Sequence, residues 1–349
     1  MLSLLAWIYG KVTNVRNRLY ERGVFETFDL RARTVSIGNI TTGGTGKTPL
    51  VAYIATLLVG RGEKVCILTR GYGRESPGQR VLVSDGKEIL ANIRESGDEP
   101  FELAQKLIGK AIVIADADRV SAAEWAKRKF GVTAFVLDDG FQHRRAKRDL
   151  DIVCIDATNP FGGRKILPAG RLREPLHNLK RADVVVITRS NLVERVDNLK
   201  SEISKLNPVA AVFEATNKIS QIIELVRFNA NSQAGGNGNV SADLSKFGGI
   251  TVQNPAYAFC GIGNPANFYA QLRQENFVLV ATLDFPDHQV YTRQHITFIE
   301  KHAARRGCKI LLTTAKDAVK LRDLKFEIPC FVVEIEMEFD DANGFTSLL

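Results

Sequence analysis

The sequence predicts an α/β fold in which a doubly wound, mostly parallel sheet is followed by a second, smaller α/β domain. Strand and helix patterns alternate up to residue 188, which is typical of a parallel sheet covered by helices. A glycine-rich loop joins the first strand pattern to its helix, as in phosphate-binding folds. A second alternating unit begins at residue 256. We therefore expect a core over 1–208, a two-stranded hinge and polar loop over 209–250, and the smaller domain over 251–349.

The composition is that of a globular protein with an anionic partner. Of the 349 residues, 45% are apolar and 25% are charged, which is ordinary for a folded chain. The formal net charge of +8 suits a nucleotide, a nucleic acid or an acidic membrane surface. The five cysteines are scattered without a C-x-x-C pair, so we expect free thiols in a reducing compartment and neither a disulfide framework nor a zinc site.

The N-terminal segment has a helical apolar pattern. Leu5, Ile8, Val12, Val15 and Leu19 recur at spacings of three and four, and basic residues lie between them. No stretch approaches the ~20 apolar residues of a membrane span, and the order of charged and apolar residues is not that of a signal peptide. Two interpretations stay open: a helix that packs on the core, or a helix that lies on an anionic membrane surface.

The glycine-rich loop has the composition of a P-loop, which predicts a P-loop NTPase-like core. It follows a strand pattern over 35–37 and ends in Gly46, Lys47 and Thr48, where a helical pattern begins. Glycines let backbone N–H groups approach phosphate, and the helix N-terminus adds positive potential. Lys47 would reach the β- and γ-phosphates, and the Thr48 hydroxyl would bind Mg²⁺. Threonine stands where the usual motif opens with glycine. The expected nucleotide-binding residues are Thr41, Thr42, Gly43, Gly44, Thr45, Gly46, Lys47 and Thr48.

The remaining strands of the first unit follow in order, and one of them ends in two carboxylates. The strand over 134–138 runs into Asp138 and Asp139, which is a Walker B pattern when a P-loop precedes it, because such an Asp serves the metal. The other strand patterns cover 64–69, 111–115, 151–156 and 182–188, helical patterns cover 49–58, 101–107 and 119–129, and 81–84 with 87–89 predict a short hairpin.

Polar loops follow several of these strands, where open α/β sheets bind ligands. The two arginines of the turn over 70–74 can grip phosphate. Asp98 and Glu99 begin a helical pattern, so they either cap that helix or take a proton from an attacking hydroxyl. His143 either faces a ligand or is an ordinary loop residue. The long loop over 161–175 sets Arg and Glu among Gly and Pro, and such loops are usually functional.

The second unit begins with an expected ribbon. Residues 209–214 and 220–227 alternate like two paired strands, and the polar, glycine-rich segment from 229 to 236 predicts a loop or linker. His288 follows Asp287 at the end of a strand, so it is either a packed or solvated side chain or a functional one. Further strands are expected over 256–260, 278–284, 310–314 and 331–336, with helices over 266–274 and 294–306.

Eight motifs taken together resemble one family. In chain order they are SIGNITTGGTGKTP, TRGYGR, SGDEP, LDDGFQHRRAKRDLDI, LPAGRLREP, FCGIGNP, FPDHQVY and TTAKDAVKL. They resemble the tetraacyldisaccharide 4′-kinases, the lipid A 4′-kinases of Gram-negative bacteria. The resemblance implies Mg²⁺-dependent transfer of the ATP γ-phosphoryl group to the 4′-hydroxyl of a tetraacylated glucosamine disaccharide 1-phosphate. It also implies a peripheral enzyme on the cytoplasmic face of the inner membrane, a two-stranded hinge, and Thr41 as the first P-loop residue.

The resemblance also implies roles for individual residues. Asp98 of SGDEP would be the catalytic base, with His288 of FPDH as its partner. Asp138 and Asp139 would organise metal and phosphate together with Lys47. The metal would be held by Thr48, Asp139 and Glu174. Contacts to acceptor or phosphate would come from Arg70, Tyr72, Arg119, Gln142, His143 and Arg171. Ala315 departs from the family, whose members commonly carry Glu there, so no contact from such a Glu is expected.

Two other functions are weighed against this one. A P-loop NTPase that acts on a protein partner would hydrolyse nucleotide without lipid. A nucleic-acid-binding protein is suggested by the charge alone, and no clustered aromatic and basic motif supports it. We therefore expect ATP and Mg²⁺ as cofactors, the tetraacyldisaccharide 1-phosphate lipid and a membrane surface as partners, no nucleic acid, and a monomer.

Overall fold

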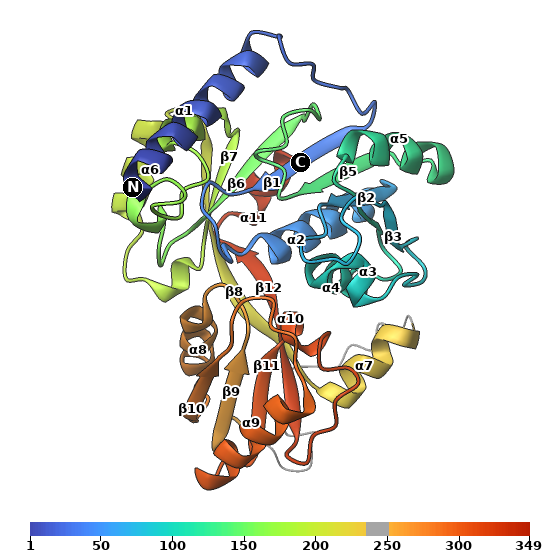
Figure 1. Cartoon of the computed structure of the whole chain (residues 1–349), viewed down its shortest axis with the longest axis vertical. Helices are drawn as coiled ribbons and strands as arrows, with labels where there is room; N and C mark the ends of the chain where they lie inside the picture. The colour runs from blue at the N-terminus through green and yellow to red at the C-terminus, as the bar shows by residue number, and fades with distance from the viewer. Residues whose placement is uncertain (235–250) are drawn as a thin grey trace.

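The computed structural model describes residues 1–234 and 251–349, which form a larger and a smaller domain (Figure 1). The α-helices are α1 (Leu2–Glu21), α2 (Lys47–Gly60), α3 (Ile93–Ser96), α4 (Asp98–Lys106), α5 (Arg119–Phe130), α6 (Asp197–Leu206), α7 (Leu225–Ala234), α8 (Pro265–Gln274), α9 (Arg293–Arg305), α10 (Ala315–Ala318) and α11 (Ala342–Ser347). The strands are β1 (Arg33–Gly38), β2 (Val65–Thr69), β3 (Val81–Ser84), β4 (Ile112–Ala115), β5 (Ala134–Asp138), β6 (Leu150–Asp156), β7 (Val184–Thr188), β8 (Ala211–Glu224), β9 (Ala256–Cys260), β10 (Leu279–Asp284), β11 (Ile310–Thr314) and β12 (Cys330–Phe339).

One continuous sheet runs through both domains. In the described part of the chain its strand order is β10-β9-β11-β12-β8-β7-β6-β1-β5-β2-β4-β3. Neighbours pair in parallel except β8 with β12 and β3 with β4. The parallel strands of the larger domain are buried on both faces, which explains their near-continuous runs of Val, Ile and Leu. The predicted doubly wound sheet is thereby confirmed.

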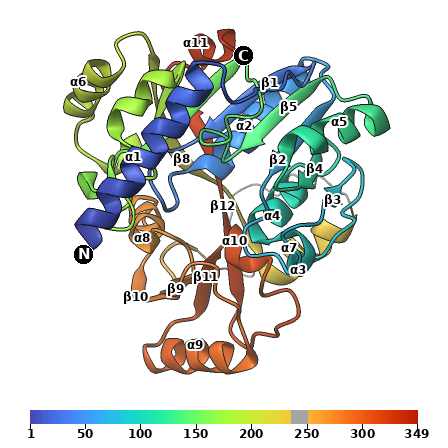
Figure 2. The same cartoon turned by 45° about the horizontal axis from the view of Figure 1, so that its top comes forward.

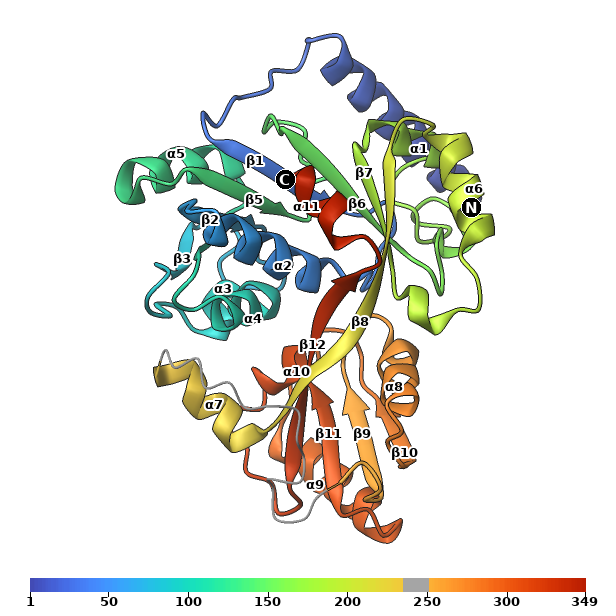
Figure 3. The same cartoon turned by 180° about the vertical axis from the view of Figure 1, so that it is seen from behind.

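The ribbon between the domains differs from the predicted one. We expected two strands over 209–214 and 220–227, but β8 is one strand through both segments, and its antiparallel partner is β12 (Figure 3). The five residues between the segments, ATNKI, contain no Gly or Pro to form a turn, so the chain continues straight. Residues 225–234 form α7 where a strand end and a loop were expected. The glycines of the expected loop at 235–238 lie outside the described residues.

The chain returns to the larger domain after β12. Met337, Phe339, Phe345 and Leu349 pack in the core cluster that surrounds α2, and the Arg61 guanidinium donates to the backbone carbonyl groups of Thr346 and Leu349. Residues 337–349 therefore belong to the larger core, although we assigned the whole of 251–349 to the smaller domain. The pattern of a strand that ends in apolar residues does not reveal which core receives them.

Helix α1 runs along the outside of the larger domain (Figure 2). Most of its apolar side chains are exposed. Its buried face consists of Ala6, Gly10, Thr13 and Asn17, while the apolar stripe faces outward, with Val12 60% exposed. Of the two interpretations left open, core packing by the apolar stripe is wrong. None of the helices in the described part of the chain combines the length and the apolar character that crossing a membrane requires.

Candidate active site

A cleft of about 1900 Å³ lies between the two domains. The larger domain contributes the P-loop, the end of β5 and the start of α4, and the smaller domain contributes the turns after β9, β10 and β11. These are carboxyl ends of strands, where a ligand is expected in an open α/β sheet. Most of the predicted site residues line this cleft, but Thr41, Asp98, Arg171 and Glu174 do not.

The P-loop has the predicted strand–loop–helix context. Gly46 adopts a left-handed conformation with φ of 81° directly before α2, and Lys47 is the first residue of that helix. The Asn39 amide donates to the Thr45 hydroxyl at 3.0 Å, and the Thr188 hydroxyl donates to the Thr45 carbonyl at 2.9 Å. These two hydrogen bonds fix the position of the loop. Residues 42–48 all line the cleft, whereas the buried Thr41 bridges to Leu172 behind the loop.

Two carboxylates follow β5 at the floor of the cleft, as predicted. The Thr69 hydroxyl donates to Asp138 at 2.9 Å, and burial, aided by the nearby charges of Glu99 and Asp139, raises the pKa of Asp138 to about 6. The Lys47 Nζ lies 3.5 Å from Asp139 Oδ1. Burial acts to raise the pKa of Asp139, but the positive charges of Lys47 and Arg173 outweigh it and lower that pKa to about 2.

The loop over 161–175 places its charged residues differently from our expectation. Arg173 reaches the cleft and donates to both oxygens of Asp139 at 2.7 Å, whereas Arg171 lies behind the P-loop, where its carbonyl accepts from the Thr42 N–H at 2.8 Å. Arg173, which was not selected from the sequence, is thus the arginine of this loop that lines the cleft, whereas the selected Arg171 lines a small adjoining hollow together with P-loop residues. The irregular loop has no periodicity that would tell which side chain points inward.

Glu174 is not placed to bind a metal in the cleft. It is 1% exposed and does not line the cleft. Its two carboxylate oxygens accept hydrogen bonds from Asn17, Gln142 and Arg181 at 2.9–3.0 Å. The carboxylate instead ties α1 to the loop, and its hydrogen-bonding capacity is already used.

His288 lines the cleft and contacts Asp98, which lies 190 positions earlier in the chain, is 7% exposed and is not among the residues that line the cleft. The His288 Nδ1 lies 2.9 and 3.0 Å from the two oxygens of Asp98, and the Tyr72 ring packs against the imidazole. The hydrogen bond with Asp98 raises the pKa of His288. Gly97, not Asp98, is the N-cap residue of α4, but the Asp98 carboxylate also accepts a hydrogen bond from the Glu99 N–H in the first turn of that helix at 3.0 Å.

Five of the expected acceptor-binding residues line the cleft. Arg70, Tyr72, Arg119, Gln142 and His143 all line it. Burial, together with the charges of Arg119 and other nearby arginines, lowers the pKa of His143 to about 3. The imidazole of His143 is therefore neutral at physiological pH and would contact a ligand by hydrogen bonding.

Two groups in the cleft were missed by sequence reasoning. Arg16 of α1 donates to the Gln142 carbonyl at 2.8 Å, and it lines the cleft together with Tyr9. Gly263, in the GIGNP turn after β9, lies so close to the P-loop that a methyl group on it would be 3.0 Å from the Gly44 nitrogen. The glycines of GIGNP were a usable signal for this close approach, whereas nothing in the apolar pattern of α1 points to Arg16.

The oxygen ligands present fit a Mg²⁺ ion that is held mainly by nucleotide phosphates. Thr48 and Asp139 both line the cleft beside the P-loop. No group of three or more His, Cys, Asp or Glu side chains suited to a metal occurs among residues 1–234 and 251–349. Mg²⁺ commonly uses one or two protein oxygens together with phosphates and water, so this small donor set is sufficient.

Known proteins match the chain over nearly all of its length. A family model described as Tetraacyldisaccharide-1-P 4'-kinase matches residues 1–349. The curated tetraacyldisaccharide 4'-kinase of Halothermothrix orenii is 39% identical over 323 residues, which cover 92% of this chain and 82% of the relative. That of Desulfotalea psychrophila is 35% identical over 346 residues, which cover 97% of this chain and 93% of the relative.

A solved structure has the same fold across both domains. The crystal structure of LpxK from Aquifex aeolicus, described as an "apo" form in complex with ATP, matches with a TM-score of 0.75 at 29% sequence identity. The match covers 99% of this chain and 96% of that one.

Proposed function

Since the chain belongs to the tetraacyldisaccharide-1-P 4'-kinase family, we propose that the interdomain cleft carries out the family's reaction with Asp98 as the catalytic base. The enzyme is an ATP-dependent lipid kinase of lipid A synthesis. It transfers the γ-phosphoryl group to the 4'-hydroxyl of a tetraacylated glucosamine disaccharide 1-phosphate. The assignment of roles to residues rests on one observation, the pairing of Asp98 with His288, which lines the same cleft as the P-loop.

The proposed chemistry follows from the charges in the cleft. The 4'-hydroxyl transfers its proton to a carboxylate oxygen of Asp98 as the hydroxyl oxygen attacks the γ-phosphorus, and ADP leaves. His288 orients the Asp98 carboxylate, and Lys47 supplies positive charge at the phosphates. Thr48 and Asp139 would hold Mg²⁺, which supplies further charge neutralisation when bound. Arg173 keeps Asp139 ionised and positioned.

Replacement of Asp98 by Asn tests the base. The amide keeps the shape of the side chain but cannot accept the proton, so we expect kcat to fall by about 10²–10⁴-fold. Transfer of label from γ-labelled ATP into tetraacyldisaccharide 1-phosphate in detergent micelles measures it, and binding of a fluorescent ATP analogue should stay within about twofold of wild type. Glu124→Gln, at an exposed carboxylate of α5, is the matched control. An unchanged kcat in Asp98→Asn would refute the assignment.

We also propose that the enzyme works as a peripheral monomer on the cytoplasmic face of the bacterial inner membrane. The exposed apolar stripe of α1 supports membrane contact, because it lies next to basic residues that favour anionic lipid. The acceptor is itself a lipid, and Arg16 of the same helix lines the cleft. Light scattering of the detergent-solubilised protein tests the monomeric state.

A charge placed on the apolar stripe tests the membrane contact. Ile8→Glu and Val12→Glu should each weaken binding to vesicles of mixed zwitterionic and anionic lipid by at least about tenfold, because a carboxylate must enter the interface. Sedimentation with the vesicles measures the bound fraction. Phe298→Glu makes the same exchange at an exposed apolar residue of α9 and is the control. Equal vesicle binding by wild type and both α1 variants would contradict the proposal.

A further inference from the structure

Asp98 is a buried carboxyl group that is surrounded by charged side chains. It is 7% exposed, and burial alone raises the pKa of a carboxyl group. The charged and titratable groups around it come from three elements. They are Glu99 and Glu102 of α4, Asp287 and His288 of the turn after β10, and Lys316, Asp317 and Lys320 of α10 and the turn that follows it.

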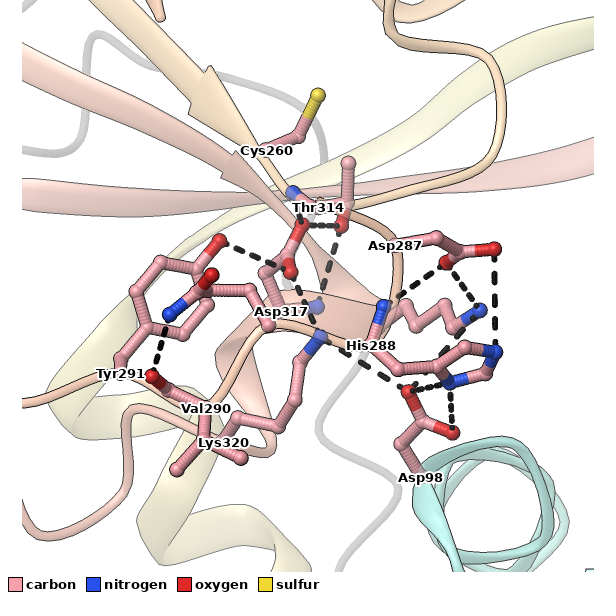
Figure 4. Close-up of polar contacts among 12 residues, drawn as sticks. Asp98, Cys260, Asp287, His288, Val290, Tyr291, Thr314, Asp317 and Lys320 are labelled. Atoms are coloured by element: carbon pink, nitrogen blue, oxygen red, sulfur yellow. Dashed lines mark hydrogen bonds and ion pairs between the residues drawn. The ribbon is translucent and has the colours of Figure 1, made fainter. Parts of the chain in front are cut away.

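Lys320 is held in place by a carboxylate that is itself completely buried. Its Nζ lies 2.9 Å from Asp317 Oδ1 and 3.8 Å from Asp98 Oδ2 (Figure 4). Asp317 is 0% exposed. The Gly261 N–H, the Thr314 hydroxyl and the Tyr291 hydroxyl donate to it at 2.9, 2.7 and 3.1 Å. The ammonium group therefore has a defined position beside Asp98.

Lys316 is arranged differently from Lys320. Its Nζ lies 3.1 Å from Asp287, 3.2 Å from Glu99 and 4.0 Å from Asp98. It is shared among three carboxylates that belong to both domains, and its charge contributes more than that of Lys320 to lowering the pKa of Asp98. Lys320, by contrast, pairs with Asp317, whose position is fixed by hydrogen bonds, and the Lys320 charge lies beside Asp98.

We propose that Lys320 is a positioning residue for the kinase reaction: presented by Asp317, it places a fixed positive charge beside Asp98 and keeps this residue a carboxylate that can accept the 4'-hydroxyl proton. The inference rests on the proposed role of Asp98 as the base. Asp98 lies in the larger domain and Lys320 in the smaller one, so the base receives this charge only in the domain arrangement seen here.

The direction of the effect on protonation follows from the charges. Burial acts to raise the pKa of Asp98, but the hydrogen bond with His288 and the charges of Lys316, His288 and Lys320 outweigh it and lower that pKa. Removal of Lys320 takes away one of these charges, so the pKa rises. A base with a higher pKa is protonated at higher pH, and turnover is then lost from the acidic side.

The test compares kcat/KM of Lys320→Met with that of wild type at each pH between about 4.5 and 8.5, with the labelled-lipid assay in detergent micelles. The ratio cancels the titration of ATP and of the lipid phosphate. An opposite charge within about 4–6 Å shifts a carboxyl pKa by about 1–3 units, and the cations that remain reduce the effect. We expect the acid limb to move up by about one pH unit, with a loss of up to about threefold near pH 4.5 and no loss at the alkaline plateau.

Companion variants separate charge from packing. Lys320→Arg keeps the positive charge and should keep the wild-type profile to within about 0.3 pH unit. Asp317→Asn combined with Lys320→Met removes both buried charges, avoids an unpaired Asp317, and should move the acid limb in the same direction by a smaller amount. Lys301→Met, at an exposed lysine of α9, is the control and should leave the ratio flat.

The outcomes distinguish this inference from the proposed function. A Lys320→Met ratio that is equally reduced at every pH would show a merely structural role and overturn the inference. If Lys320→Met does not fold, the double variant decides in the same way. Failure of the proposed function has another signature, since Asp98→Asn would then keep its turnover whatever the Lys320 variants do.

Discussion

The P-loop and His288, the partner of Asp98, line the same cleft, but the two sides of the site are held in place by different means. The P-loop consists of consecutive residues and is fixed by Asn39 and Thr188 within the larger domain. The pair joins residues 190 positions apart in two domains, and local hydrogen bonds, such as that from the Glu99 N–H to Asp98, hold each member only within its own domain. The nucleotide side of the site therefore persists wherever the smaller domain lies, whereas the base side exists only when the two domains meet. Nucleotide binding and base assembly should thus be separable by mutation.

Lys47→Ala should have the largest effect and should act on the nucleotide side alone. Loss of the charge at the phosphates should lower kcat/KM for ATP by about 10³-fold or more. The His288 pKa, which the hydrogen bond with Asp98 raises, should stay raised, and NMR titration of the imidazole measures it. The stabilisation from this pair is complete below the unfolded pKa of His and is lost as pH rises through the folded one. A normal His288 pKa in Lys47→Ala would show that the two sides are coupled.

Gly263→Ala should have a smaller effect and should act on the contact between the two sides. The added methyl group would lie 3.0 Å from the Gly44 nitrogen and 3.3 Å from the Gly43 Cα, so the smaller domain must move back slightly. We expect kcat to fall by about tenfold, because small misplacements of reacting groups are costly, while ATP affinity stays within about twofold. Rapid-quench and equilibrium-binding measurements separate the two quantities. A variant that loses ATP affinity in proportion to kcat would contradict the separation.

The same contrast explains which site residues could be predicted. Two contiguous strand–loop motifs contain Lys47, Thr48, Asp138 and Asp139. The spacing within each motif determines where these side chains lie, and the structure places all four in the cleft. For Asp98, the sequence pattern did not decide between helix capping and a role as the catalytic base, because its partner, His288, comes from another domain. Local spacing contains no information about such a partner, and only the resemblance to a family paired it with His288.

The loop over 161–175 and the ribbon show two other limits of sequence reasoning. Within the loop, Arg171 and Glu174 were expected in the cleft, but Arg173 is the residue that reaches Asp139. An irregular backbone gives no rule for side-chain direction. In the ribbon, β8 continues through residues 215–219, where alternation weakens. The alternation of polar and apolar residues in β8 could not reveal that the antiparallel partner of this strand is β12, more than a hundred residues later.

The return of residues 337–349 to the larger core has a consequence for the order of folding during synthesis. Met337, Phe339, Phe345 and Leu349 complete the cluster around α2, yet the ribosome makes them after the whole of the smaller domain. Domains usually fold in the order in which they emerge. Here the larger domain is the first to be synthesised but the last to complete its core. The apolar residues of α2 that 337–349 cover therefore stay uncovered in the nascent chain while β9, β10 and β11 are being translated. Chaperone dependence should therefore fall sharply once residues 337–349 have left the ribosome and packed along α2.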